Sequence, residues 1–132
     1  MKKLKILIAE DDATSRALLQ AFLSKFGECN LVMDGKEAVE EARRARDNRE
    51  SYDLICMDLR MPHMDGQEAI REIRKHEAET AAVQPAKIIV TTAHSDLQSI
   101  TSALLARCNA YVVKPIDTSR LLVELQTLGL VK

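Results

Sequence analysis

Five short apolar runs alternate with five segments of helical character along the chain. Four of the five runs are rich in Ile, Val or Leu without polar alternation, which is typical of strands buried on both faces of a parallel sheet. The predicted strands are residues 5–9, 29–33, 54–57, 87–91 and 110–113. The predicted helices are residues 14–26, with Gly27 as C-cap, 35–46, 66–76, 95–107 and 117–128. Each strand is followed by one helix, which predicts an α/β fold with a doubly wound, five-stranded parallel sheet.

The composition and charge of the chain limit the classes of protein to which it can belong. Its 132 residues, 46% of them apolar and 30% charged, are enough for one globular domain with one core. The net charge of −1 gives no electrostatic basis for binding nucleic acid or an anionic membrane, and no apolar segment is long enough to cross a bilayer. Cys29, Cys56 and Cys108 are widely spaced, which indicates reduced thiols in a cytoplasmic protein.

Polar side chains follow the apolar runs at the points where the predicted strands end. Since the strands of a parallel sheet all point the same way, these side chains meet along one edge, and ligands bind there near the place where the strand order reverses. In the strand order 2-1-3-4-5, which we expect for five such units, the first and third strands are neighbours at that place. The strand-end residues are Glu10, Asp11 and Asp12 after the first strand, Asp58 after the third, Thr91 and Thr92 at the end of the fourth, and Lys114 and Pro115 after the fifth.

The acids at this edge repel one another and therefore indicate a bound cation. Two carboxylates about 4 Å apart repel by roughly 4 kcal/mol at an effective dielectric of about 20. Oxygen ligands with open positions suit Mg²⁺, which takes one or two carboxylates together with waters and phosphate oxygens. Lys114 is a point charge suited to a phosphate or a carboxylate, and Thr92 can donate a hydrogen bond to a phosphate oxygen. Asp58 can attack a phosphoryl group and form an aspartyl phosphate, whereas Asp12 is expected to cap the next helix.

Over essentially its full length, the chain resembles the receiver domain of two-component response regulators. The segment ILIAEDD (6–12) is similar to the acidic-pocket strand of that family, and DLICMDLRMPHMDG (53–66) is similar to its phosphoacceptor segment. The segment VTTA (90–93) resembles the part that carries the switch threonine, and YVVKP (111–115) resembles the part with the switch aromatic residue, the lysine and the proline. Each motif alone is weak, but together, in order and at normal spacing, they are highly specific.

The resemblance implies a flavodoxin-like (βα)5 fold and a phosphorylation site. Asp58 would be the phosphoacceptor, with Lys114 and Thr92 acting on the phosphoryl group. The ligands implied for Mg²⁺, or for Mn²⁺ in its place, are the side chains of Asp11 and Asp58, the backbone carbonyl of Arg60 and, through water, Glu10.

Further residues are implied to serve as switches or to set the lifetime of the phosphoryl group. Thr92 and Tyr111 would be the switch residues, with a plain core role as the alternative for Tyr111. The peptide bond that precedes Pro115 would be cis. Arg60 and His94 border the phosphoryl group in the family and would tune its loss to water, although both can also be read as solvent-facing loop residues.

The resemblance also implies how the protein would act. Residues 1–132 would be a single receiver domain without an output domain. The protein would be a phosphoacceptor signalling switch with slow autodephosphorylation, not an enzyme. A histidine kinase or a histidine phosphotransfer protein would supply the phosphoryl group. The partners downstream would be a protein target of unknown identity and, on phosphorylation, a second copy of the chain.

Three other classes share part of this pattern, and particular residues disfavour each of them. A Mg²⁺-dependent phosphohydrolase of the haloacid dehalogenase type would carry a second Asp two residues after the nucleophile, where this chain has Arg60. A flavin-binding protein would need a Ser/Thr-rich phosphate loop after the first strand, where this chain has three acids. A pseudo-receiver that only binds a partner usually lacks the aspartate or the lysine, and both are present here.

Overall fold

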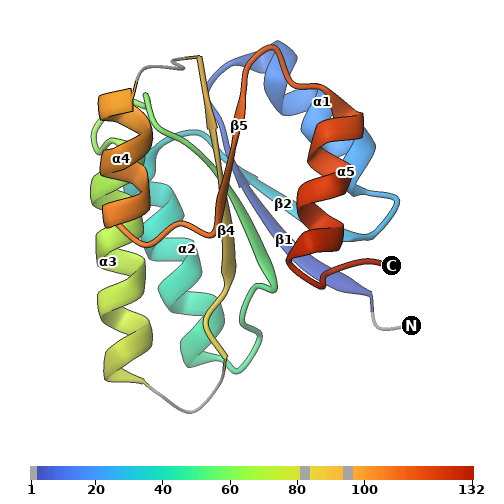
Figure 1. The fold of residues 1–132 in the computed structure, drawn as a ribbon. Helices are drawn as coiled ribbons and strands as arrows, with labels where there is room; N and C mark the ends of the chain where they lie inside the picture. Colours follow the sequence, from blue (N-terminus) through green and yellow to red (C-terminus); the bar gives the residue numbers. More distant parts are fainter. Residues whose placement is uncertain (1–2, 81–83, 94–96) are drawn as a thin grey trace.

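A five-stranded parallel sheet with the order β2-β1-β3-β4-β5 forms the centre of the protein in a computed structural model (Figure 1). Residues 3–80, 84–93 and 97–132 are described. The strands are β1 (Leu4–Ala9), β2 (Gly27–Val32), β3 (Leu54–Asp58), β4 (Lys87–Thr92) and β5 (Ala110–Val113). The helices are α1 (Ala13–Leu23), α2 (Gly35–Asp47), α3 (Gly66–Glu79), α4 (Leu97–Leu105) and α5 (Thr118–Thr127). The predicted fold class and strand order are confirmed.

Helices cover both faces of the sheet, and the alternation of strand side chains gives each face its own apolar core. The helices α1 and α5 lie on one face, and α2, α3 and α4 lie on the other (Figure 1). The first core includes Ile6, Ile8, Cys56, Ile89 and Val112 of the strands with Leu19, Leu23, Leu121 and Leu125 of the helices. The second includes Leu7, Ile55, Met57 and Val90 of the strands with Val39, Ile70 and Ile73 of the helices. Within the described ranges, none of the helices has the length and apolar character that crossing a membrane requires.

Aspartate side chains cap four of the helices at their first turns. Each accepts a hydrogen bond of 2.8 to 2.9 Å from a backbone N–H two or three residues further on, which satisfies a donor that the helix itself leaves open. These caps are Asp12, Asp34, Asp65 and Asp117. The predicted role of Asp12 as the start of the first helix is therefore confirmed.

The boundary between α1 and β2 differs from the predicted one. The helix ends at Leu23, not at residue 26, and β2 begins at Gly27, not at residue 29. Gly27 pairs with Leu4 of β1, and a Cβ atom on Gly27 would collide with the Leu4 carbonyl oxygen. The glycine predicted as a helix cap is thus the first residue of an edge strand, where close approach of two backbones excludes a side chain.

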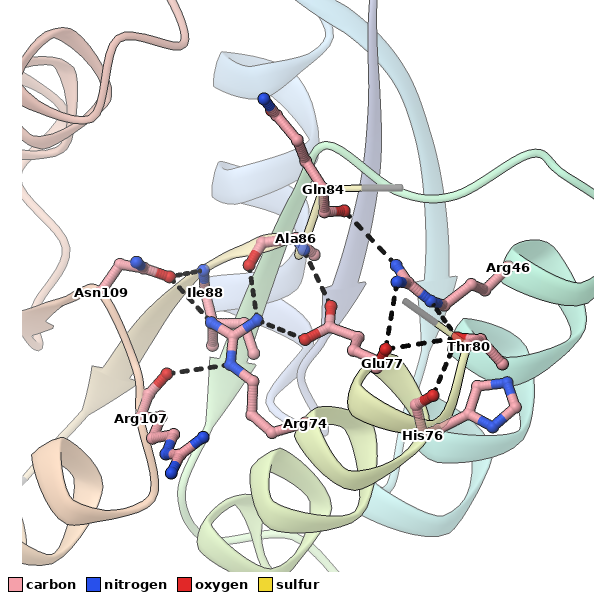
Figure 2. A network of polar contacts seen from close by, with 10 residues as sticks. All are labelled: Arg46, Arg74, His76, Glu77, Thr80, Gln84, Ala86, Ile88, Arg107 and Asn109. Carbon is pink, nitrogen blue, oxygen red and sulfur yellow. Dashed lines mark hydrogen bonds and ion pairs between the residues drawn. The ribbon is translucent and has the colours of Figure 1, made fainter. Parts of the chain in front are cut away.

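At the amino-terminal edge of the sheet, Arg74 and Glu77 of α3 join the helices to the strands (Figure 2). Arg74 donates to the carbonyl oxygens of Ala86 and Arg107 at 2.8 and 3.1 Å, and to Oδ1 of Asn109 at 2.9 Å. Its guanidinium lies 2.7 Å from Glu77, which also accepts the Ala86 N–H at 2.8 Å. The two side chains are only 12% and 8% exposed, so this ion pair is largely buried, and both partners also bond to the backbone around them.

Replacing Arg74 by Met should lower the free energy of unfolding by about 3 kcal/mol, because the Glu77 carboxylate would stay buried without its counter-charge. Urea unfolding measures this difference. Arg71→Met is the matched control, since Arg71 is exposed on the same helix, and its effect should stay within about 0.5 kcal/mol. Equal losses in the two variants would contradict a structural role for the buried pair.

Candidate functional site

Four strand ends bring charged and hydroxyl side chains to the carboxyl edge of the sheet. Glu10 follows β1, Asp58 ends β3, Thr92 ends β4 and Lys114 follows β5. Because β1 and β3 are hydrogen-bonded neighbours, Glu10 and Asp58 leave the sheet side by side. The site is thus built from segments that lie far apart in the sequence.

The Lys114 ammonium lies between two buried carboxylates. Its Nζ is 2.8 Å from Oε1 of Glu10 and 3.4 Å from Oδ2 of Asp58. Glu10 is fully buried and Asp58 is 5% exposed, so water screens these contacts poorly. The Lys114 backbone N–H donates to the Thr92 carbonyl oxygen at 2.7 Å, and the bond to Pro115 is cis, as the resemblance implied. Contacts to both the backbone N–H and the ammonium group therefore fix the position of Lys114.

Glu10, Asp11 and Asp58 form an acidic group with the composition of a metal site. One carboxylate oxygen from each lies within 4.8 Å of the others. Glu10 uses both of its oxygens inside the protein, because Oε1 pairs with Lys114 and Oε2 accepts the Asp12 N–H at 3.1 Å. Asp11 is exposed, so Asp11 and Asp58 can offer oxygens directly while Glu10 suits contact through water. Hard oxygen donors with room for waters fit Mg²⁺.

The two charged partners at this edge have shifted pKa values. Burial raises the pKa of Asp58 to about 6, and the hydrogen bond and negative charge of Glu10 add to this effect against the opposing charge of Lys114. Burial alone would lower the pKa of Lys114, but the hydrogen bond to Glu10 and the charge of Asp58 outweigh it and raise that pKa. Ionised Asp58 is thus disfavoured by its surroundings, and a bound cation would relieve that penalty.

The other predicted site residues take different positions. Thr92 is buried at the end of β4. Tyr111 is half-buried and packs against the core under α2 and α3. Arg60 is exposed, and its backbone N–H points to Oδ1 of Asp58 at 3.4 Å. His94 lies outside the described residues.

Two residues that were not predicted as site residues help to shape the site. Arg16 donates from one guanidinium nitrogen to the carbonyl oxygens of Glu10 and Asp11 at 3.1 and 3.3 Å. Gly66 begins α3 so close to β3 that a Cβ atom would collide with the Asp58 carbonyl oxygen. Gly66 was visible as part of the phosphoacceptor segment, but Arg16 carried no signal because its acceptors are backbone atoms.

The chain belongs to the response regulator receiver domain family, whose sequence model matches residues 6–126. The receiver domain of sensor histidine kinase PA1611 from Pseudomonas aeruginosa PAO1, with a magnesium ion coordinated in its active site cleft, is 33% identical with a TM-score of 0.79. That comparison covers 97% of this chain and 99% of the other. The receiver domain of Ssk1 from Saccharomyces cerevisiae, in complex with the phosphotransfer protein Ypd1, is 30% identical with a TM-score of 0.83 over 96% and 89% of the two chains.

Curated relatives of the chain are much longer proteins. Hybrid signal transduction histidine kinase G of Dictyostelium discoideum is 38% identical over 119 residues, which are 88% of this chain and 3% of that protein. Transcriptional regulatory protein ZraR of Salmonella typhimurium is 33% identical over 121 residues, which are 90% of this chain and 25% of that protein. The chain thus matches only one part of each of these relatives. It is a two-component receiver domain, and its acidic cluster fits the magnesium ion seen in a similar receiver domain.

Mg²⁺ should bind less tightly as the pH falls, because protons compete with the metal for Asp58. The pKa of Asp58, raised to about 6, means that this carboxyl is neutral in more acidic solution. Below that pKa the affinity should fall by about tenfold per pH unit, and calorimetric titration from about pH 8 to about pH 5 measures it.

Two variants separate the contributions of the carboxylates to this pH dependence. Asp58→Asn should bind weakly and lose the pH dependence that arises from Asp58. Asp11→Ala should bind weakly at every pH and keep that dependence. A wild-type affinity that is constant across this range would contradict the assignment of Asp58 as a metal ligand.

Proposed function

We propose that this chain is a phosphoacceptor signalling switch that receives a phosphoryl group on Asp58 with the help of Mg²⁺. The position of Asp58 is the observation that carries this assignment. Its carboxyl group is buried at the edge of the sheet, 3.4 Å from the Lys114 ammonium, with an oxygen of exposed Asp11 within 4.8 Å. A carboxylate in this position has a positive charge and a candidate metal site next to it. Both would stabilise the negative charge that builds up when the carboxylate attacks a phosphoryl group.

The transfer step needs a nucleophile, a leaving group and compensation of charge. An Asp58 carboxylate oxygen forms a bond to phosphorus while the bond between phosphorus and the donor's histidine nitrogen breaks. The electrons of the broken bond stay with the imidazole, which takes up a proton. Lys114 and Thr92 contact the phosphoryl oxygens during the transfer. Asp11, Asp58 and the carbonyl of Arg60 would hold Mg²⁺, which would supply further positive charge when bound.

We infer that the phosphoryl donor is a histidine kinase or a histidine phosphotransfer protein. The similar receiver domain of Ssk1 was crystallised with the phosphotransfer protein Ypd1. The relative from Dictyostelium discoideum is a hybrid histidine kinase, in which a matching segment belongs to the same polypeptide as a kinase. Both relationships support a protein histidine, and not a small metabolite, as the usual source of the phosphoryl group.

Phosphorylation would change the surface formed by α4, β5 and α5. The phosphoryl group adds about −1.5 to −2 charges, and it does so at the edge where β4 and β5 end. Thr92 would move toward the phosphoryl group and Tyr111 would turn inward, which shifts the population between two conformations. Leu104, Leu105 and Val123 are exposed on α4 and α5, so this surface offers apolar contacts to a downstream protein or to a second copy of the chain.

The phosphorylated state would end by slow autodephosphorylation. Arg60 follows the phosphoacceptor by two residues and is exposed, and His94 follows Thr92 by two residues in the sequence. In the family, the side chains at these two positions border the phosphoryl group, so we assign both a tuning role and not a catalytic one. The chain would thus act as a switch that is reset by water, not as an enzyme that turns over a substrate.

Acetyl phosphate with Mg²⁺ should add one phosphoryl group to the protein, because Asp58 can attack this acyl phosphate as it would a phosphohistidine. Intact mass spectrometry detects the adduct, and Asp58→Asn should show none. Asp12→Asn is the matched control, since it removes a neighbouring acid but keeps a residue that caps α1 well, and it should still be phosphorylated. Absence of the adduct on wild type, or an equal adduct on Asp58→Asn, would refute the phosphoacceptor assignment.

A further inference from the structure

Thr91 carries a buried hydroxyl that has no hydrogen-bond partner within the described residues. The residue is 1% exposed, and in the ranges that the structure covers its Oγ1 neither donates nor accepts a hydrogen bond. Buried hydroxyls in folded proteins nearly always have a partner, because a buried polar group without one destabilises the fold. The surroundings of Thr91 suggest why this hydroxyl is present.

Thr91 lies next to Asp58 on the same face of the sheet. The two residues are register partners on β4 and β3, and such partners in neighbouring parallel strands point to the same face. Two positions earlier, Ile89 and Cys56 both belong to the core under α1 and α5, which confirms the face. The Thr91 hydroxyl is therefore placed beside the proposed phosphoacceptor.

The Lys114 side chain has to cross β4 to reach Asp58. Lys114 follows β5 and Asp58 ends β3, and β4 lies between these two strands. The ammonium nevertheless reaches 3.4 Å from Asp58 and 2.8 Å from Glu10, which follows β1, the next strand beyond β3. On this face, the β4 residue between Asp58 and Val112 is Thr91. A Lys114 side chain that reaches Asp58 from the end of β5 therefore has to pass the Thr91 position of β4.

We propose that Thr91 is a positioning residue whose hydroxyl donates a hydrogen bond to the Asp58 carboxyl group in the phosphorylated protein. This role rests on the proposed phosphoryl transfer to Asp58. In the resting protein, Oδ2 of Asp58 faces the Lys114 ammonium. When phosphoryl oxygens attract that ammonium, the carboxyl group loses its nearest donor, and the adjacent hydroxyl of Thr91 takes its place.

A hydroxyl that finds its partner in only one of two states favours that state. Its removal should relieve an unsatisfied group in the resting protein and delete a hydrogen bond in the loaded protein. The two effects have opposite signs. A hydroxyl that acts only on the fold would change both states alike.

Thr91→Val keeps the shape of the side chain and removes the hydroxyl, and Mg²⁺ with beryllium fluoride serves as the loading probe in place of the phosphoryl group. The melting temperature of the unloaded variant should exceed that of wild type by a few degrees. Its affinity for beryllium fluoride should be weaker by roughly 3- to 10-fold. Thr91→Ser, which keeps a hydroxyl, should restore the wild-type affinity.

Ser51→Ala is the matched control for the loss of a buried hydroxyl. Ser51 Oγ is also buried without a partner in the described part of the chain, and it precedes β3 at the edge of the sheet opposite Asp58. Its replacement should shift the melting temperatures of the loaded and unloaded proteins equally. The affinity for beryllium fluoride should be unchanged.

Three results would overturn the role of Thr91. Equal shifts of the loaded and unloaded Thr91→Val protein would show that the hydroxyl acts only on the fold. A lower melting temperature of the unloaded variant would show that the hydroxyl already has a partner at rest. If the wild-type protein binds no beryllium fluoride and takes up no phosphoryl group, the proposed function itself is refuted. If the wild type loads normally and Thr91→Val has the same affinity, only the proposed role of Thr91 is refuted.

Discussion

The contact of one ammonium, that of Lys114, with two buried carboxylates is the interaction on which the rest of the site depends. Glu10 and Asp58 are held in a largely water-excluded edge of the sheet, where an uncompensated charge destabilises the protein by several kcal/mol. Lys114 contacts both acids, at 2.8 and 3.4 Å, and its single positive charge offsets part of their negative charge. Because Glu10 follows β1, Asp58 ends β3 and Lys114 follows β5, these contacts form only when the three strands are assembled in the sheet.

The two edges of the sheet have opposite characters. At the amino-terminal edge, Arg74 and Glu77 form an ion pair and hydrogen bonds with the backbone around them, which stabilises this end of the sheet (Figure 2). At the carboxyl edge, the pKa of Asp58 is raised to about 6 and the Thr91 hydroxyl has no partner among the described residues. Groups that are poorly satisfied at rest respond to an added charge, so the edge proposed to bind phosphate and metal is also the one that an added charge would change. A sheet with satisfied polar groups at one edge and poorly satisfied groups at the other can change at one edge while the rest of the fold stays the same, as a switch requires.

Local patterns in the sequence predicted much of the fold, and long-range backbone contacts account for most of what they missed. Apolar runs and helical periodicity extend over neighbouring residues, so the five units and the cap at Asp12 could be read directly. The true start of β2 at Gly27 depends on close approach to Leu4 in another strand, which no local pattern records. The role of Arg16 could not be predicted, because it donates hydrogen bonds to backbone carbonyl oxygens. Every residue has such an oxygen, so the sequence does not mark the acceptors.

The part of the candidate site that depends only on strand direction could also be predicted from the sequence. The strand-end rule brought Glu10, Asp58 and Lys114 to one edge, because the direction of parallel strands determines it. The rule does not say which way a side chain points once it leaves the strand. It therefore did not show that Tyr111 packs half-buried against the core under α2 and α3, or that the Lys114 ammonium pairs with both Glu10 and Asp58.

The most direct test of the central claim is to locate the phosphoryl group on the chain. After treatment with acetyl phosphate and Mg²⁺, borohydride reduces an aspartyl phosphate to homoserine, and mass spectrometry of the peptides identifies the converted residue. We predict homoserine at position 58. Homoserine at Asp11 or Asp12 instead, or at no position in a protein that carries the phosphoryl adduct, would contradict it.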